Sequence, residues 1–169
     1  MNAIIIKGAQ LQSQSWKYFL KALCTDSSKS GIFNKLEITE NEMVVTDGFR
    51  IHMMENIHQF QSGVYNIESK SAKSVVLEKT DGTYPEWKRL IDGDVEKKGT
   101  EFMSGENSNN SISLFTVFYE LGIMLNYKFF DDMLIDETSF VPYLLTTDPI
   151  VFKHGNGNKT VIMPINPEY

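Results

Sequence analysis

The sequence predicts an α+β fold with a mostly antiparallel sheet, because short strand-like segments outnumber the helical ones. The segment "LEITENEM", residues 36–43, alternates apolar and polar residues, as a strand does before a tight turn. An apolar strand, "NAIIIK", opens the chain. Four more strands are expected at about 33–39, 42–46, 50–57 and 63–67.

Helices are predicted where apolar residues recur at helical spacing. In "LQSQSWKYFLKALCT", Trp16, Phe19, Leu20 and Leu23 form one apolar stripe. In "NYKFFDDMLI", Asn126 is a suitable N-cap before a second apolar pattern. The segment "ESKSAKSVV" is expected to form a third, short helix.

The last third of the chain is expected to be ordered. "SISLFTVFYELGIML", residues 111–125, is interpreted as strand-rich, and three strands, "FVPYLL", "PIVFKH" and "TVIMPI", follow the predicted helix. "GNGN" reads as the hairpin loop between the last two strands. Strand, helix and three strands thus occur at 2–57 and again at 112–165, as a repeat of pattern and not of residue identity.

Composition excludes several classes of protein. The 169 residues carry a net charge of −6, which argues against coating nucleic acid through global charge but leaves room for a local basic face. No apolar run approaches the length of a membrane span. Cys24 is the single cysteine, so no intrachain disulfide can form, and a cytoplasmic location is the simplest expectation.

Catalytic and metal-binding motifs are not evident. His52, His58 and His154 show no spacing typical of a metal site, and no nucleophile elbow or phosphate loop occurs. We therefore expect no enzyme activity, no metal and no cofactor. A small hydrolase that uses Asp47 and His52 remains a distant alternative.

Asp47-Gly48 is ordinary turn chemistry, but an arginine directly after it calls for a reason. Together with three other segments, "VVTDGFRIHM" resembles the bacterial replicative sliding clamp, the beta subunit of DNA polymerase III. It is similar to that family's Thr-Asp-Gly-His-Arg-Leu segment, with Phe49 in place of His. "YPEWKRLI" is similar to Phe/Tyr-Pro-Asp-Tyr/Trp-Arg-Arg-Val, "LNYKFFDDML" to Phe-Asn-x-x-Tyr-Leu-x-Asp-x-Leu, and "TVIMPI" to Val-Met-Pro-Met.

The resemblance implies a shortened, single clamp-like domain made of two β-α-β-β-β halves. Residues 1–91 would form the first half and the pocket linker, and residues 111–169 the second half. The polar, Gly- and Asn-rich segment 92–110 fits no part of the family and is expected to be a flexible insertion.

The resemblance also implies a hydrophobic pocket that captures peptide motifs of replication proteins. Apolar walls with a flexible thioether, and arginines on the rim that orient the ligand, suit such a pocket. Its residues would be Thr46, Gly48, Phe49, Arg50, Ile51, Pro85, Arg89, Leu90, Val161, Met163, Pro164 and Ile165. Taken singly, Arg50 is more simply a solvated strand residue, and Met163-Pro164-Ile165 is more simply core with an edge-strand proline.

A DNA-facing surface is the second implied site. Its residues would be Lys17, Lys21, Lys70 and Lys73, which contact phosphate without sequence specificity. They could instead be the solvated faces of two helices. The expected function is a sliding-clamp-like DNA replication protein and processivity factor of a phage or mobile element, which forms a homo-oligomer and tethers a polymerase. The alternative is an interaction module that binds or competes for clamp-binding peptides and never encircles DNA.

Overall fold

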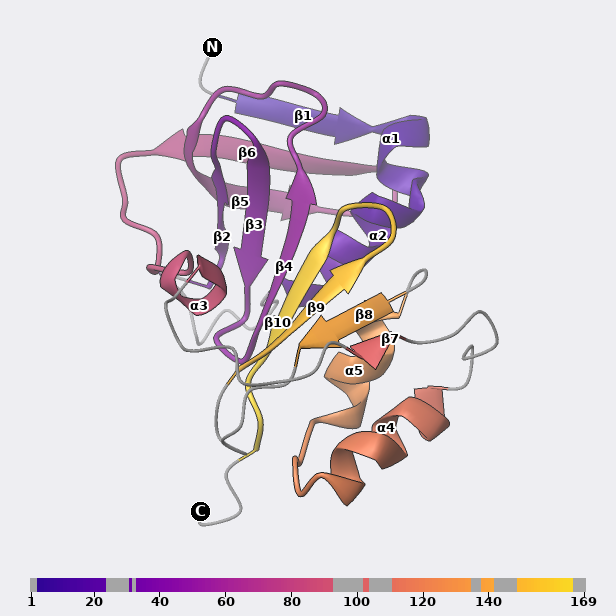
Figure 1. Cartoon of the computed structure of the whole chain (residues 1–169). Helices are drawn as coiled ribbons and strands as arrows, with labels where there is room; N and C mark the ends of the chain where they lie inside the picture. The colour runs from indigo at the N-terminus through magenta and orange to yellow at the C-terminus, as the bar shows by residue number, and fades with distance from the viewer. Residues whose placement is uncertain are drawn as a thin grey trace. The chain divides into compact units, whose positions relative to one another are not determined.

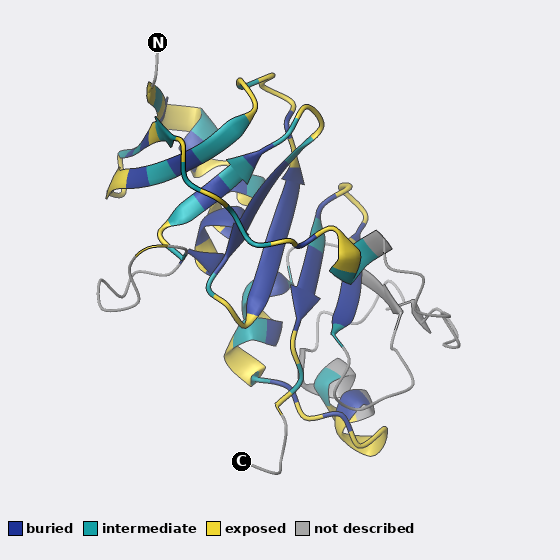
Figure 2. Cartoon of the chain, turned by 90° about the vertical axis from the view of Figure 1, so that its left-hand side faces the viewer, coloured by how far each residue is buried: buried dark blue, intermediate teal, exposed yellow. Residues whose placement is uncertain are grey.

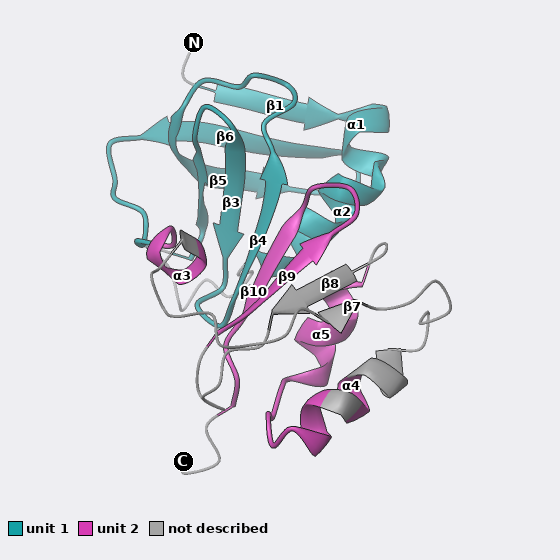
Figure 3. Ribbon diagram, viewed as in Figure 1, with its two compact units in different colours: residues 1–86 teal, residues 87–169 magenta. Residues whose placement is uncertain are grey.

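The computed structural model describes residues 3–23, 31, 33–92, 102–103, 111–134, 138–141 and 149–165. The chain divides into two compact units, residues 1–86 (unit 1) and residues 87–169 (unit 2), shown in Figure 3. The helices and strands are labelled in Figure 1. Figure 2 shows that buried residues run along the strands, whereas exposed residues gather at the turns.

Unit 1 contains a six-stranded sheet with the order β1-β6-β5-β2-β3-β4. Its strands are β1 (Ala3–Lys7), β2 (Lys35–Ile38), β3 (Glu42–Thr46), β4 (Arg50–Glu55), β5 (Gly63–Lys70) and β6 (Ser74–Thr80). Every neighbouring pair is antiparallel. The predicted strands of this part of the chain are therefore confirmed, with boundaries shifted by a few residues.

The predicted first helix of unit 1 is present in three pieces, α1 (Gly8–Gln12), α2 (Gln14–Phe19) and the 3₁₀ turn η1 (Leu20–Ala22). Ser13 separates the first two pieces, and its hydroxyl accepts a hydrogen bond from the Trp16 backbone N–H at 3.3 Å. This is the N-cap interaction that serines favour. The predicted apolar stripe is buried against the sheet, and the rings of Trp16 and Phe19 meet edge to face at 5.6 Å.

The helix expected in "ESKSAKSVV" is wrong, because this segment is a tight turn between β5 and β6. The Ser71 N–H donates to Ser74 O at 2.9 Å, and the Ser71 hydroxyl accepts from the Ser74 N–H at 3.1 Å. Val75 and Leu77 then alternate into the core with the period of a strand. Serine side chains that bond to nearby backbone favour turns over helices, which decides the local structure here.

Unit 2 contains a four-stranded antiparallel sheet with the order β10-β9-β8-β7 and three helices among its described residues. The elements are α3 (Arg89–Asp92), β7 (Phe102–Met103), α4 (Ser111–Glu120), α5 (Tyr127–Met133), β8 (Thr138–Val141), β9 (Ile150–His154) and β10 (Lys159–Ile162). The rest of segment 92–110, predicted to be a flexible insertion, lies outside the described residues. Within the described ranges, no helix is both long and apolar enough to cross a membrane.

The second predicted helix and the closing hairpin of unit 2 are confirmed. The Asn126 side chain caps α5 by accepting from the Lys128 N–H at 3.0 Å. In the turn between β9 and β10, the Gly157 N–H donates to His154 O at 2.9 Å. Both structures follow from local sequence signals.

The interpretation of residues 111–125 as strand-rich is wrong for most of the segment, because α4 occupies its first ten residues. Phe118 of α4, Phe130 of α5 and Phe152 of β9 form a fully buried triangle, with ring centroids 5.7–6.1 Å apart. The helix ends at Glu120; Gly122, two residues later, has a φ of 74°, and the Ile123 N–H returns to Phe118 O at 2.9 Å. This is a helix C-terminus of the Schellman type.

We predict that Gly48→Ala destabilises the protein more than Gly157→Ala does. Both glycines have positive φ, 92° and 83°, so each alanine carries a backbone cost of about 1–2 kcal/mol. A Cβ at Gly48 would also lie 2.9 Å from the Phe33 ring, whereas a Cβ at Gly157 meets nothing within 4 Å. Urea denaturation measures the difference, and equal losses would contradict a close contact at Gly48.

Candidate functional site

The turn after β3 is organised by the carboxylate of Asp47. Its Oδ1 accepts hydrogen bonds from the backbone N–H groups of Phe49 at 3.0 Å and Arg50 at 3.1 Å. The Thr46 hydroxyl closes the turn by donating to Arg50 O at 2.7 Å and accepting from the Gly48 N–H at 3.0 Å. The turn is therefore held by its own side chains, and only Gly48 and Phe49 are exposed.

Arg50 is not the exposed rim arginine that the sequence predicts. Its side chain is only 4% exposed, and its Nε donates to Asp47 Oδ2 at 2.9 Å in an ion pair. Its Nη2 donates to the backbone oxygen of Lys21 in the 3₁₀ turn η1. The guanidinium therefore joins the turn to the end of a helix within unit 1.

The pocket residues expected from the sequence differ widely in accessibility. Those buried in their own unit are Thr46, Arg50, Ile51 and Val161. Those half-buried are Pro85, Leu90 and Pro164, and those exposed are Gly48, Phe49, Arg89, Met163 and Ile165. In this conformation only the last two groups can touch a ligand.

The segment "YPEWKRLI" crosses the boundary between the two units. Tyr84 packs into unit 1, where burial and the nearby Glu37 carboxylate both raise the pKa of its hydroxyl. Arg89 and Leu90 begin the short helix α3, whose first turn is closed by the Leu90 N–H donating to Trp87 O at 3.0 Å. A single helical turn therefore follows Pro85, and it begins at Arg89, three residues after Glu86.

The C-terminal segment after β10 contributes the exposed thioether of Met163 and the exposed side chain of Ile165. The Ile165 N–H donates to Met124 O at 2.7 Å, so this segment lies along the connection between α4 and α5. The Met124 side chain is also exposed. Sequence reasoning missed Met124, since nothing in its own neighbourhood in the sequence connects it to "TVIMPI".

The predicted pocket draws on both units. Thr46 to Ile51 and Pro85 belong to unit 1, while Arg89, Leu90 and the C-terminal residues belong to unit 2. A single pocket formed by all of them therefore remains a prediction. Each unit nevertheless presents its own exposed apolar group for it, Phe49 in unit 1 and Met163 with Ile165 in unit 2.

The predicted DNA-facing lysines all lie in unit 1 and are exposed. Lys17 is in α2 and Lys21 in η1, whereas Lys70 ends β5 and Lys73 sits in the following turn. The Lys70 Nζ donates to Leu20 O at 3.0 Å. This contact removes solvent from the ammonium group, and burial lowers the pKa of Lys70.

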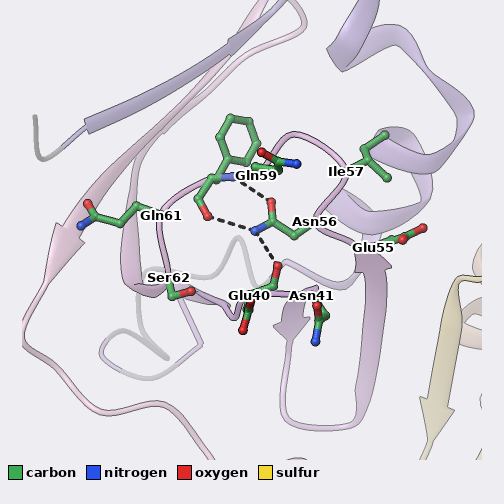
Figure 4. Close-up of a pocket in the computed structure, with 9 residues that line it drawn as sticks. Glu40, Asn41, Glu55, Asn56, Ile57, Gln59, Gln61 and Ser62 are labelled. Carbon is green, nitrogen blue, oxygen red and sulfur yellow. Dashed lines mark hydrogen bonds between the residues drawn. The ribbon is translucent and has the colours of Figure 1, made fainter.

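A hollow of about 780 Å³ that the sequence did not predict lies in unit 1, between the turn after β2 and the loop after β4. Figure 4 shows Asn56 at its centre. The Asn56 carboxamide donates to Thr39 O and Phe60 O, both at 3.0 Å, and accepts from the Phe60 N–H at 3.0 Å. These bonds occupy both amide hydrogens and tie Asn56 to the backbone of the two loops, so its side chain shapes the hollow from within.

The alternative of a hydrolase using Asp47 and His52 finds no support in unit 1. The Asp47 carboxylate is occupied by Arg50 and by backbone amides. The His52 imidazole is fully buried, stacks on the Tyr18 ring at 4.3 Å, and donates from Nδ1 to Tyr18 O at 2.8 Å. Among the described residues, no group of three histidines, cysteines or carboxylates could hold a metal ion.

Unit 1 as far as β4, and unit 2 from β7 on, share one order of elements: a strand, a bent or paired helix and three antiparallel strands. No protein-family model and no curated protein sequence matches the chain. Solved structures do match it, and they show that the chain has the fold of the beta subunit of DNA polymerase III.

Three of these structures illustrate the likeness. The beta subunit from Thermotoga maritima aligns with a TM-score of 0.65 over 98% of this chain at 15% identity. The protein from Eubacterium rectale aligns with 0.64 over 100% at 15%, and the Caulobacter crescentus beta sliding clamp with 0.64 over 97% at 11%. The chain spans 66% of the length of each of these three proteins. The expected clamp-like α+β fold is thereby confirmed.

We predict that Arg50→Ala lowers the free energy of unfolding by about 3 kcal/mol, because it leaves the Asp47 carboxylate and Lys21 O without their buried cation. Arg89→Ala, at an exposed position, should change it by less than about 0.5 kcal/mol. Chemical denaturation of both variants measures this. Equal stabilities would show that the buried pair contributes nothing.

Proposed function

We propose that the chain is a non-catalytic, clamp-like DNA replication protein that binds short peptide motifs of its partners and tethers a polymerase to duplex DNA. The observation that carries the proposal is the sliding-clamp fold, which the chain shares with solved DNA polymerase III beta subunits along nearly its whole length. Because the chain spans 66% of those subunits, the proposal needs support from its own residues.

The peptide-binding part of the proposal is supported by exposed apolar side chains in the segments that resemble the clamp family. Phe49, Met163 and Ile165 are each more than one-third exposed. Large exposed apolar groups are typical of interaction sites, and the flexible thioether of Met163 suits a wall that adapts to a ligand. Arg89, which is exposed in α3, remains available to orient a peptide carboxylate or carbonyl.

The DNA part of the proposal is supported by exposed lysines on and beside the α2–η1 helix. Lys17 and Lys21 carry positive charge on a chain whose net charge is −6, so any attraction to phosphate must be local. Binding to duplex DNA is expected to be weak, sensitive to salt and indifferent to sequence.

The alternative is an interaction module that binds the same peptides without encircling DNA. It requires the exposed apolar residues alone, whereas a ring also requires contacts between copies. Strand β1, at one end of the unit 1 sheet, carries the exposed Ile5 and offers one surface for such a contact.

The proposed peptide site is tested with a peptide of the pattern Gln-Leu-x-Leu-Phe. We expect a dissociation constant in the micromolar range, equivalent to about 8 kcal/mol, with most of the affinity from burying its Leu and Phe side chains. Met163→Ala should weaken binding by about tenfold, because it removes an apolar wall. Isothermal titration calorimetry measures both values.

Ile57→Ala is the matched control for this experiment. Ile57 is the most exposed aliphatic side chain among the described residues, and it lies at the end of β4 away from Phe49. Its replacement should leave peptide affinity unchanged. Equal effects of the two substitutions, or no binding to the wild-type chain, would contradict the proposed site.

The oligomeric state in solution distinguishes the ring from the interaction module. A ring predicts a defined oligomer in light scattering, and Ile5→Lys, which places a charge on the exposed face of β1, should shift it towards the monomer. Lys7→Ala, on the same strand, is the control and should leave the oligomer in place. A wild-type chain that is monomeric at every accessible concentration would leave only the module.

A further inference from the structure

The C-terminal end of the α2–η1 helix is held by basic side chains from the sheet. Three of its carbonyl oxygens accept from three different residues: Tyr18 O from His52 Nδ1 at 2.8 Å, Leu20 O from Lys70 Nζ at 3.0 Å, and Lys21 O from Arg50 Nη2. The last carbonyls of a helix carry partial negative charge and are only partly satisfied by the backbone; here Leu20 O also accepts from the Leu23 N–H at 3.4 Å. Cationic side chains are therefore well suited to this position.

Two of these three basic residues were expected to meet ligands. Arg50 was expected at the rim of the peptide pocket and Lys70 on the DNA-facing surface. The structure commits both of their charged groups to backbone oxygens of one helical turn, and Arg50 also pairs with Asp47 at 2.9 Å. Each would have to give up these bonds before it could contact a phosphate or a peptide.

We propose that Arg50 and Lys70 are positioning residues, which fix the end of the α2–η1 helix and thereby the placement of Lys17 and Lys21, and that neither of them contacts DNA or peptide directly. This inference rests on the proposed DNA-binding function. It assigns two roles among these lysines: Lys17 and Lys21 contact phosphate, and Lys70 supports them.

The loss of solvent around Lys70 agrees with this division. Burial lowers the pKa of its ammonium group, although the residue as a whole is exposed. Lys73 lies three residues further on, in the turn, and is also exposed; among the described residues its ammonium group makes no hydrogen bond to the helix end. The two lysines thus form a matched pair for experiment.

The first measurement is amide hydrogen exchange in residues 17–23 of the full chain without DNA. Lys70→Gln should speed exchange there by about tenfold, the effect of losing one charge-assisted hydrogen bond, and Lys70→Arg should restore protection. Lys73→Gln should change nothing. Unchanged exchange in Lys70→Gln would overturn the assignment of Lys70.

The second measurement is the salt dependence of binding to a linear duplex. Lys17→Gln should reduce the slope of log K against log salt by about 0.9, the contribution of one phosphate contact. Lys70→Gln should lower affinity at every salt concentration and leave the slope unchanged. A slope reduced as in Lys17→Gln would show that Lys70 contacts phosphate, and would overturn the proposal.

Arg50 is tested with Arg50→Lys and, should that variant not fold, with Asp47→Asn, which removes the carboxylate that orients the guanidinium. Either should speed exchange in residues 17–23. Unchanged exchange combined with weakened peptide binding would instead make Arg50 a peptide contact. If the wild-type chain binds no duplex at all, the proposed DNA function fails, while the exchange data still decide whether Arg50 and Lys70 hold the helix.

Discussion

The buried guanidinium of Arg50 is the constraint on which the local structure of unit 1 depends. A buried charge is costly unless it is paired and hydrogen-bonded. Asp47 and the carbonyl of Lys21 meet that requirement, so the turn after β3 and the end of the helix must hold fixed positions together. The positive φ of Gly48 and its close approach to Phe33 follow from the same turn. The primary role of the arginine after this Asp-Gly turn is therefore to stabilise the fold of unit 1.

The burial of Arg50 could not be predicted from the sequence, and the reason is physical. One of its partners, Asp47, is three residues away and belongs to a recognisable turn. Another is a backbone oxygen of residue 21, and a backbone oxygen has no signature in a sequence. Alternating residues in a strand indicate which face is apolar. They do not indicate that a cationic side chain on that strand will donate a hydrogen bond to a backbone carbonyl of a distant residue.

The predictions of secondary structure were correct where an element depends on residues close in the sequence, and wrong where it depends on residues distant in the sequence. The Ser13 and Asn126 caps and the turn before Lys159 depend on neighbours in sequence, and the elements that they bound were predictable. Residues 111–120, which form helix α4, were interpreted as strand-rich. The conformation of this helix is decided by Phe118 meeting Phe130 and Phe152, contacts between residues far apart in the chain.

The motifs that resemble the clamp family combine residues of two kinds. Thr46, Arg50 and Val161 are buried, where they stabilise the fold. Their presence in a sequence is therefore evidence for the fold before it is evidence for a binding site. Phe49 and Met163 are large, apolar and exposed, and side chains of this kind are typical of interaction sites. In the proposed function, these exposed members are the ones that a ligand contacts. Under that proposal Phe49, which stands where the family has His, affects the choice of partner, because it lies on the exposed part of a turn that the buried members hold in place.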